Sequence, residues 1–309
     1  EFGLSKWGVS FATKPKSLTR FKGWLKDGLY GALTYLADER AVKREDLKNY
    51  FPEVKSTLVI AFDYSHIARS AKKFYASEKS NGFKIANYVF GFKGKDYHYE
   101  VREVLTKIGE RLKEIDPSIE FKFSLDTQPI LERDFAYQSG LGWYGKNSML
   151  INRDIGSYFI IGSLLLNTDI ELPNTKFETD HCGQCTRCAD ACPTDAIIAD
   201  KVVDSTKCIS YWTIESKAEK FPNVISDNLE GWTFGCDICQ EVCPWNNHRV
   251  PVQIEDFVNP RYGETVFEKD TIFNYTEDEF RERYIKSPIK RPKHHGIKRN
   301  LNELEKGEK

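Results

Sequence analysis

The chain has no excess of either charge, with 45 basic and 46 acidic side chains in 309 residues. A strongly basic, histone-like protein is therefore excluded, although a local basic patch can exist within a neutral total. No apolar run is long enough to span a bilayer, so a transmembrane helix is not expected. The N-terminus also lacks the charged, apolar and small-residue pattern of a secretory signal, and we expect a cytoplasmic protein.

Cysteine is absent from most of the chain. None of the eight cysteines lies before Cys182 or after Cys243. Cysteines that only fill a core would be scattered, and disulfides are not expected in a chain without a secretory signal. Such a concentration of thiols in one segment is typical of a set of metal ligands.

The first cysteine run has the spacing of bacterial ferredoxins, including a proline after its last cysteine. Cys236, Cys239 and Cys243 repeat the end of that run, and Cys208 is the cysteine that remains. In two-cluster ferredoxins the last cysteine of each run binds the other cluster. The predicted ligands of two [4Fe–4S] clusters are Cys182, Cys185, Cys188 and Cys243 for one, and Cys192, Cys208, Cys236 and Cys239 for the other.

Zinc is the main alternative, because pairs of cysteines two residues apart also bind tetrahedral zinc. A zinc ribbon, however, does not use a third cysteine two residues further on, nor the Cys-Pro endings at Cys192 and Cys243. We therefore predict clusters. A pure electron carrier would need little more than this region, so the long segment before Cys182 favours an enzyme that uses the electrons.

Strands separated by helices predict an α/β (α+β) domain over residues 1–170. Short apolar runs rich in β-branched residues indicate the strands, and an apolar face with helical spacing indicates a helix that ends before Pro117. The strands are expected at Thr57–Phe62, Phe121–Leu125 and Tyr158–Leu166, and the helix at Val101–Leu112. Residues 65–96 are polar and are expected to run over the surface. We expect a ferredoxin-like region at 171–250 and a C-terminal segment at 251–309.

Several sequence blocks together resemble the epoxyqueuosine reductase family. The blocks are Glu132-Arg-Asp-Phe-Ala-Tyr-Gln-Ser-Gly-Leu-Gly-Trp-Tyr-Gly-Lys-Asn147, Gly156-Ser157, His181-Cys-Gly-Gln-Cys185, Cys208-Ile-Ser-Tyr-Trp-Thr-Ile-Glu215, Gly235-Cys-Asp-Ile-Cys-Gln-Glu-Val-Cys-Pro-Trp-Asn246 and Lys290-Arg-Pro292. Each block alone is only suggestive. Their combination, in the expected order over nearly the whole chain, is specific.

The resemblance implies a tRNA-modifying oxidoreductase. Members of the family reduce epoxyqueuosine to queuosine at the wobble position of tRNA, with cob(I)alamin as the nucleophile and two [4Fe–4S] clusters as the electron relay. The resemblance also implies a nitroreductase-like cobalamin-binding domain. We further expect an external low-potential electron donor, a monomer and no membrane partner. Many members continue into C-terminal helical repeats, and we expect that extension to be absent here.

The resemblance also assigns site residues. Opening an epoxide to an alkene consumes two electrons and two protons and releases water, so the departing oxygen needs an acid. The family's aspartate for this role falls on Asp134, which we expect to be catalytic and to contact the cofactor. Its alternative role is structural, at a helix start or as a partner of Arg133. We expect His98 to be structural or a surface residue, and further corrin contacts at Tyr97, Asn147, Ser148 and Ser157.

A basic segment follows near the end of the chain. Residues 286–299 hold six Lys or Arg, two His and no acid. Because prolines interrupt this segment, we expect a rigid extended strip that binds RNA phosphates. A solvated surface is the alternative. The predicted RNA contacts are Lys286, Lys290, Arg291, Lys293, Lys298 and Arg299.

Two other functions remain open at this point. A different cobalamin and iron–sulfur reductase, such as a dehalogenase, is disfavoured by the missing secretory signal and by the basic segment. A two-cluster electron-transfer protein without catalysis would leave the block around Asp134 unexplained.

Overall fold

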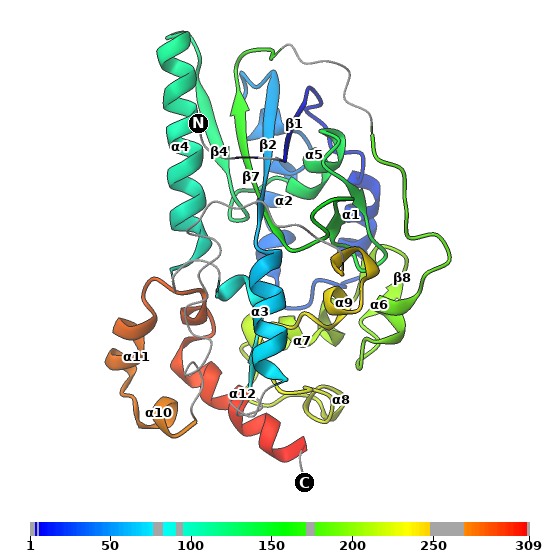
Figure 1. Cartoon of the computed structure of the whole chain (residues 1–309), viewed down its shortest axis with the longest axis vertical. Coiled ribbons are helices and arrows are strands. Elements are labelled where there is room, and N and C mark those ends of the chain that lie inside the picture. Colours follow the sequence, from blue (N-terminus) through cyan, green and yellow to red (C-terminus); the bar gives the residue numbers. More distant parts are fainter. Residues whose placement is uncertain are drawn as a thin grey trace.

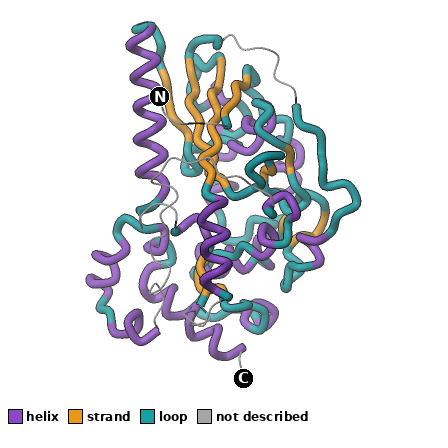
Figure 2. The backbone as a smooth tube through the Cα atoms, in the orientation of Figure 1, coloured by secondary structure: helices purple, strands orange, loops and turns teal. Residues whose placement is uncertain are grey.

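The computed structural model describes residues 4, 6–76, 83–90, 95–170, 177–247 and 269–307. Their mixed α/β fold contains a four-stranded antiparallel sheet in the order β1-β2-β7-β4. The strands are β1 (Trp7–Ser10), β2 (Ser56–Asp63), β4 (Phe121–Ser124) and β7 (Phe159–Leu166). The long helix α4 (Tyr97–Ile115) lies beside the sheet, as Figures 1 and 2 show.

The central strands β2 and β7 are covered on both faces. They pair over their full length, from Ser56 opposite Leu166 to Asp63 opposite Phe159. Alternate residues of β2 enter different buried clusters, so that Val59 belongs to one and Ile60 to another. Continuous apolar runs are typical of strands in this position. The three predicted strands and the predicted helix are confirmed, and α4 ends just before Asp116-Pro117.

Shorter elements surround the sheet in the described part of the chain. The other α-helices are α1 (Leu18–Lys26), α2 (Arg40–Lys43), α3 (Ser65–Tyr75), α5 (Glu132–Gln138), α6 (Arg187–Asp190), α7 (Ile209–Ile214), α8 (Asn223–Ser226), α9 (Ile238–Glu241), α10 (Lys269–Asn274), α11 (Glu277–Tyr284) and α12 (Lys293–Gly307). The 3-10 helices are η1 (Thr34–Leu36), η2 (Leu47–Asn49), η3 (Asn87–Val89), η4 (Ser205–Lys207), η5 (Pro244–Asn246) and η7 (Pro288–Lys290).

Three further strand pairs are short. They are β3 (Lys84–Ile85) with β10 (Trp232–Phe234), β5 (Trp143–Tyr144) with β6 (Leu150–Ile151), and β8 (Ile197–Ala199) with β9 (Val202–Val203). The parallel β3–β10 pair joins the N-terminal region to the cysteine-rich region.

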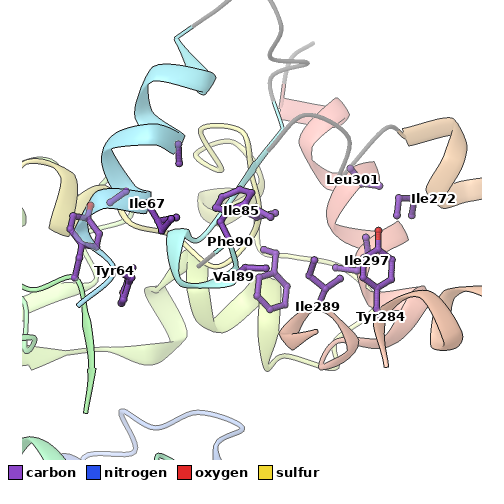
Figure 3. Close-up of a cluster of buried hydrophobic side chains, with 14 of the residues drawn as sticks. Tyr64, Ile67, Ile85, Val89, Phe90, Ile272, Tyr284, Ile289, Ile297 and Leu301 are labelled. Carbon is purple, nitrogen blue, oxygen red and sulfur yellow. The ribbon is translucent and has the colours of Figure 1, made fainter. Parts of the chain in front are cut away.

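The prediction that residues 65–96 run over the surface is wrong. Ile67 in α3 and Val89 in η3 have 0% exposure. Both belong to a buried cluster that also contains Ile297 and Leu301 of α12 (Figure 3). Helices α3 and η3 therefore have an apolar face in the core, and the polar residues of the segment lie on their other face. Residues 77–82 and 91–94 of the segment lie outside the described residues.

The prediction of an extended basic strip is also wrong. The segment forms η7 and then α12, because Pro288 occupies the first turn of η7, where its missing N–H is tolerated. Helix α12 buries Ile297, Leu301 and Leu304 and packs against α7, α8 and β10. Asn300 on the same helix donates from Nδ2 to the backbone oxygens of residues 213 and 233, each at 2.8 Å. The basic residues are thus displayed on a folded element.

The predicted domain boundaries fall on residues 171–176 and 248–268, which lie outside the described residues. One buried cluster contains Tyr158, Phe234 and Leu301, one residue from each predicted segment. The three segments therefore share core. Among the described helices, none has the length and apolar character needed to cross a membrane.

We predict that Leu301→Ala lowers the free energy of unfolding by about 2–5 kcal/mol, because it leaves a cavity at a fully buried position. Asn302→Ala is the matched control on the exposed side of α12, with an expected change within about 0.5 kcal/mol. Denaturant unfolding followed by circular dichroism measures both. Equal, small effects would show that α12 does not contribute to the core.

Candidate active site and metal centres

An exposed aspartate, Asp126, lies in the loop between β4 and α5, and the sequence motifs did not point to it. Its backbone φ is +59°, a left-handed value that non-glycine residues rarely adopt, and its side chain is 67% exposed. Tyr97 donates from Oη to Asp126 Oδ2 at 2.5 Å. Burial and the charge of Asp126 raise the pKa of Tyr97 well above its ordinary value, so the phenol is a neutral donor.

The His98 ring lies between the carboxylates of Asp126 and Asp96. Its ring stacks on Tyr97 with centroids 4.3 Å apart, and Nδ1 lies 2.6 Å from Asp96 Oδ1. Nε2 lies 3.9 Å from Asp126 Oδ2, is buried, and has no hydrogen-bond partner in the described part of the chain. Burial would raise the pKa of Asp96, but the hydrogen bonds with His98 and the charge of Lys290 lower it overall. Asp96 therefore orients the His98 ring, and protein atoms enclose Nε2 in this conformation.

More titratable side chains gather around Asp126 from distant parts of the sequence. Burial and the carboxylates of Glu215 and Asp126 raise the pKa of Tyr35 to about 12. Burial, followed by the charge of Asp126, raises the pKa of Glu132 to about 8, so Glu132 holds its proton at neutral pH. Arg291 pairs with Glu215 at 2.9 Å and interacts with the charge of Asp126. The site thus combines proton donors with a cation around one exposed carboxylate.

Asp134 has a different setting. It lies in the first turn of α5 with 0% exposure. Its carboxyl oxygens accept hydrogen bonds from the backbone N–H groups of Lys16 (2.9 Å) and Ser17 (2.6 Å), and from Gln138 Nε2 (2.6 Å). This carboxyl group anchors the N-terminal segment to α5 and presents no surface to a ligand in this conformation. Arg133 instead donates to the backbone oxygen of Ser148 at 2.7 Å.

Asn147 and Ser148, two predicted corrin contacts, have protein partners. Asn147 donates from Nδ2 to the Cys239 backbone oxygen at 3.2 Å, and its Oδ1 accepts from the Met149 N–H at 3.2 Å. Ser148 has φ +66° and accepts the bond from Arg133 through its carbonyl oxygen. The turn around Gly145 therefore contacts the cysteine-rich region.

Ser157, a third predicted corrin contact, is buried at the same junction. Its Oγ donates to Gln240 Oε1 at 2.9 Å, and its N–H donates to Asn246 Oδ1 at 2.8 Å. The preceding residue, Gly156, has φ +71°, and a Cβ there would lie 2.0 Å from Asn246 Oδ1. Glycine is required because another segment of the chain approaches closely, and the approach does not leave room for a ligand.

The thiols of the cysteine-rich region interact electrostatically with one another. Cys243 interacts with Cys182, Cys185 and Cys188, Cys208 interacts with Cys192, and Cys239 interacts with Cys208, Cys188 and Cys192. The two predicted ligand sets stay a prediction. Burial, with a smaller contribution from the other thiols of its predicted set, raises the pKa of Cys243 to about 11. Among the described residues, no three His, Cys, Asp or Glu side chains lie close enough to bind a single metal ion.

Two features of these thiols suit a thiolate-bound cofactor. Cys192 Sγ accepts a hydrogen bond from the Ala196 N–H at 3.3 Å, and such bonds stabilise thiolates that bind iron. The buried side chains of Trp143 and Ile151 pack with Cys182 and Cys243 and give these thiols an apolar wall. The thiol donors and these surroundings fit a bound cluster.

The predicted RNA contacts divide into two sets. Lys290 Nζ lies 3.8 Å from Asp96 Oδ2, and the backbone oxygen of Lys286 accepts a bond from the Asp96 N–H, so this part of the segment borders the candidate active site. Lys293 begins α12, and Lys298 lies over the ring of residue 273.

Arg299 is not available to RNA. Its guanidinium donates to the backbone oxygens of Trp212, Ser216 and Ala218 at 2.7 to 2.9 Å. These bonds tie α12 to the end of α7, and we therefore correct the expected role of Arg299 to a structural one.

Comparison with known proteins identifies the family. The model described as "Epoxyqueuosine reductase QueG, DUF1730" matches residues 44–127, and "4Fe-4S double cluster binding domain" matches residues 181–246. The chain is 35% identical over 297 residues to the epoxyqueuosine reductase of Synechocystis sp., covering 94% of this chain and 96% of that protein. The Cyclobacterium marinum epoxyqueuosine reductase is 35% identical over 303 residues, which is 98% of this chain and 93% of that protein. The chain belongs to the epoxyqueuosine reductase family.

Solved structures of epoxyqueuosine reductases share the fold. The Streptococcus thermophilus structure has a TM-score of 0.79 and 25% identity, covering 98% of this chain and 77% of that one. A Bacillus subtilis structure, with its aspartate catalytic loop swung out of the active site, has a TM-score of 0.82 and 26% identity, covering 99% and 78%. A third structure, of an epoxyqueuosine reductase with an epoxyqueuosine-modified tRNA-Tyr stem loop, has a TM-score of 0.81.

These matches confirm three predictions from the sequence. The resemblance to the epoxyqueuosine reductase family is correct, and the mixed α/β fold is that of its solved members. The [4Fe–4S]-binding region is confirmed, since the matched residues 181–246 include all eight cysteines.

We predict about eight iron and eight acid-labile sulfide atoms per chain after anaerobic purification, as two [4Fe–4S] clusters require. Cys208→Ser and Cys243→Ser are matched variants, one in each predicted ligand set. Each should reduce the iron content to about four and leave one cluster signal in the electron paramagnetic resonance spectrum. One or two zinc ions, or loss of both clusters in every variant, would contradict the grouping.

Proposed function

We propose that this chain reduces epoxyqueuosine to queuosine in the anticodon of tRNA. The observation that carries the proposal is the group of proton donors around Asp126, beside a basic segment, in a member of this family. The reaction breaks the two epoxide C–O bonds, forms the alkene and releases the oxygen as water. It consumes two electrons and two protons, so the site must provide acids at the departing oxygen.

Asp126 is our proposed acid for that oxygen. The Bacillus subtilis enzyme has its catalytic aspartate on a loop that leaves the active site. Asp126 lies on a loop with a strained backbone and an exposed carboxyl group, whereas Asp134 lies in a helix and is buried. Strained residues of this kind cluster at functional sites. The sequence-based prediction of Asp134 as the acid stays a prediction, and the geometry favours Asp126.

The neighbours of Asp126 support proton delivery. Tyr97 Oη and His98 Nε2 both lie near its carboxyl group, and Asp96 orients the His98 ring. Glu132 holds a proton at neutral pH and interacts electrostatically with Asp126. A second proton is therefore stored close to the first, which suits a reaction that consumes two.

We propose that the chain uses two [4Fe–4S] clusters and cobalamin. The predicted corrin contacts at Asn147 and Ser157 have protein partners, but the exposed carboxyl group of Asp126, beside Tyr97, offers a surface that fits a bound group. Tyr97 would face such a cofactor. Cobalamin, when bound, supplies the reducing nucleophile, and the clusters, when bound, supply electrons one at a time from an external low-potential donor.

Asp126→Asn should lower turnover on epoxyqueuosine-containing tRNA by about 10²–10⁴-fold, because the amide cannot transfer the proton. Asp134→Asn is the matched variant. It removes an acceptor for the N–H groups of Lys16 and Ser17, so we expect a loss of stability of about 1–3 kcal/mol with turnover of the folded enzyme largely kept. Single-turnover assays and thermal unfolding measure the two effects separately.

If Asp134→Asn slows turnover of the folded enzyme and Asp126→Asn does not, Asp134 is the acid. If neither variant slows turnover, the proton comes from water or from Glu132. The wild-type chain is the reference for the two alternative functions. If it does not turn over epoxyqueuosine tRNA but removes halogen from a substrate, it is a dehalogenase. If it only transfers electrons, it is an electron-transfer protein.

The basic segment gives an RNA prediction. Replacing Lys290, Arg291 and Lys293 together by Ala should weaken tRNA binding and flatten its salt dependence, because fewer counterions are released from phosphates. The matched control removes three exposed cations, Arg102, Lys107 and Arg111, from α4, and should leave both quantities unchanged. Binding titrations at several salt concentrations measure them. Equal effects from the two triple variants would indicate only a general charge effect.

A further inference from the structure

Three exposed cations near the start of the chain have no acidic partner. Lys14, Lys16 and Arg20 are exposed, and none of them forms an ion pair with a carboxylate in the described part of the chain. Lys22, two residues after Arg20 in α1, differs because it pairs with Glu45 at 2.9 Å. Cations that gather without acidic partners attract an anionic partner and increase its rate of association.

Two of these cations lie over aromatic rings. Lys16 Nζ lies 3.8 Å from the centroid of the Phe177 ring, and the Arg20 guanidinium lies 4.6 Å from that of Tyr144. Tyr137 stacks on Phe177, which is 49% exposed, and also contacts Tyr144. Aromatic rings are enriched at protein interfaces. We call this surface the cation–aromatic patch, and it consists of Lys14, Lys16, Arg20, Tyr137, Tyr144 and Phe177.

The backbone of the patch is fixed before any partner arrives. The buried carboxyl group of Asp134 accepts hydrogen bonds from the N–H groups of Lys16 and Ser17. Gln138 Nε2 donates to the backbone oxygen of Lys14 at 3.2 Å. A surface that is already ordered loses little conformational entropy when a partner docks. The bonds from α5 therefore suit the patch to docking.

The patch adjoins thiols of the cysteine-rich region. Tyr144 directly follows Trp143, whose buried side chain packs with Cys182 and Cys243. Successive side chains of a strand point to opposite faces, so Tyr144 and these two thiols lie on opposite faces of β5. Phe177 precedes Cys182 by five residues, which span at most about 18 Å. A molecule docked on the patch is thus close to the first cysteine run.

The first cysteine run also lies near the protein surface. The residues that separate its first three cysteines are all exposed, namely Gly183, Gln184, Thr186 and Arg187. In the second run, Asp237 and Gln240, on either side of Ile238-Cys239, are buried. An external electron donor therefore reaches the first run more directly than the second.

The position of the patch separates it from the proposed RNA-binding segment. Helix α5 packs on the Val59 face of β2, and α4 packs on the Ile60 face. Figure 1 shows α1 and α5 on one side of β2 and α4 on the other. Lys290 of the RNA-binding segment lies over the ring of Tyr99 at the start of α4, 5.6 Å from its centroid. The patch therefore suits an anionic partner other than the tRNA.

We infer that the cation–aromatic patch docks the external electron donor, an acidic protein that carries one electron at a time, and that this donor reduces the predicted cluster that includes Cys182. The inference rests on the proposed function, which requires such a donor. One electron leaves the redox centre of the donor and enters the cluster, and no bond forms or breaks. Electrostatic complementarity of this kind acts mainly on the rate of association.

The test measures how fast a reduced, acidic plant-type [2Fe–2S] ferredoxin reduces the full chain loaded with its clusters. Stopped-flow bleaching of the cluster absorption gives the second-order rate constant at several salt concentrations. Replacing Lys14, Lys16 and Arg20 together by Gln should lower this rate constant about tenfold at low salt and flatten its salt dependence. Glutamine keeps much of each side chain, so the change removes mainly charge.

Two controls separate docking from damage to the clusters. The charge-conserving set Lys14→Arg, Lys16→Arg and Arg20→Lys should keep the wild-type rate constant. Reduced methyl viologen is a small cation that needs no docking surface, and it should reduce the Gln variant no more slowly than the wild-type chain. Equal slowing with methyl viologen would overturn the inference, because the defect would then lie in the clusters.

A matched set on the other face of the sheet tests whether position matters. Replacing Arg102, Lys107 and Arg111 of α4 together by Gln removes the same charge and should leave the ferredoxin rate constant unchanged. Equal slowing by both sets, or no slowing by the patch set, would overturn the inference. A wild-type rate constant that does not depend on salt would also overturn it.

Binding of tRNA to the same variants decides between the two anionic partners. The patch set should keep the wild-type affinity for tRNA. A loss of tRNA affinity as large as the loss of ferredoxin rate would overturn the inference and assign the patch to RNA. Because the readout is cluster reduction, it does not need turnover of epoxyqueuosine tRNA. Absence of clusters from the wild-type chain would instead contradict the proposed function.

Discussion

The predicted exchange of cysteines between two cluster ligand sets is the constraint on which much of the proposed function depends. Cys243 interacts electrostatically with Cys182 of the other run, and Cys192 interacts with Cys208. With the predicted ligand sets, the two runs could not separate without disrupting both clusters. Metal binding at such sites is coupled to folding, because the ligands come together only in the folded chain. The N-terminal region docks onto this unit, for example through Asn147 and the backbone oxygen of Cys239.

That docking explains why the expected corrin contacts have other partners. A small polar residue beside glycine indicates that another group lies close to the backbone. The sequence does not show whether that group is a ligand or another segment of the chain. At Gly156-Ser157 it is Asn246, from the second cysteine run. At Asn147 it is the loop that carries Cys239. These residues position the cysteine-rich region against the sheet, and a bound ligand has to be sought around Asp126.

Local signals in the sequence predicted the central strands and the long helix. Strands β2 and β7 and helix α4 follow from apolar runs and periodicity, because each depends on residues close in sequence. The burial of α3 and α12 could not be predicted in this way, because their apolar faces pack together although more than half of the sequence separates them. The site shows the same limit. Asp126 and Asp134 differ in burial and backbone conformation, and only a three-dimensional structure separates them.

The fold also sets the distance between the sources of electrons and of protons that the proposed reaction needs. Helix α7 begins directly after Cys208 and ends directly before Glu215, which pairs with Arg291 near Asp126. Its six residues span about 9 Å at 1.5 Å per residue. Cys208 therefore lies about one short helix from Glu215, and burial together with the charges of Glu215 and Asp126 raises the pKa of Tyr35. Arg299 and Asn300 fix α7 to α12 through side-chain bonds to the backbone. A displacement of α12 would therefore move the proposed RNA-binding segment and the predicted cluster ligand Cys208 together.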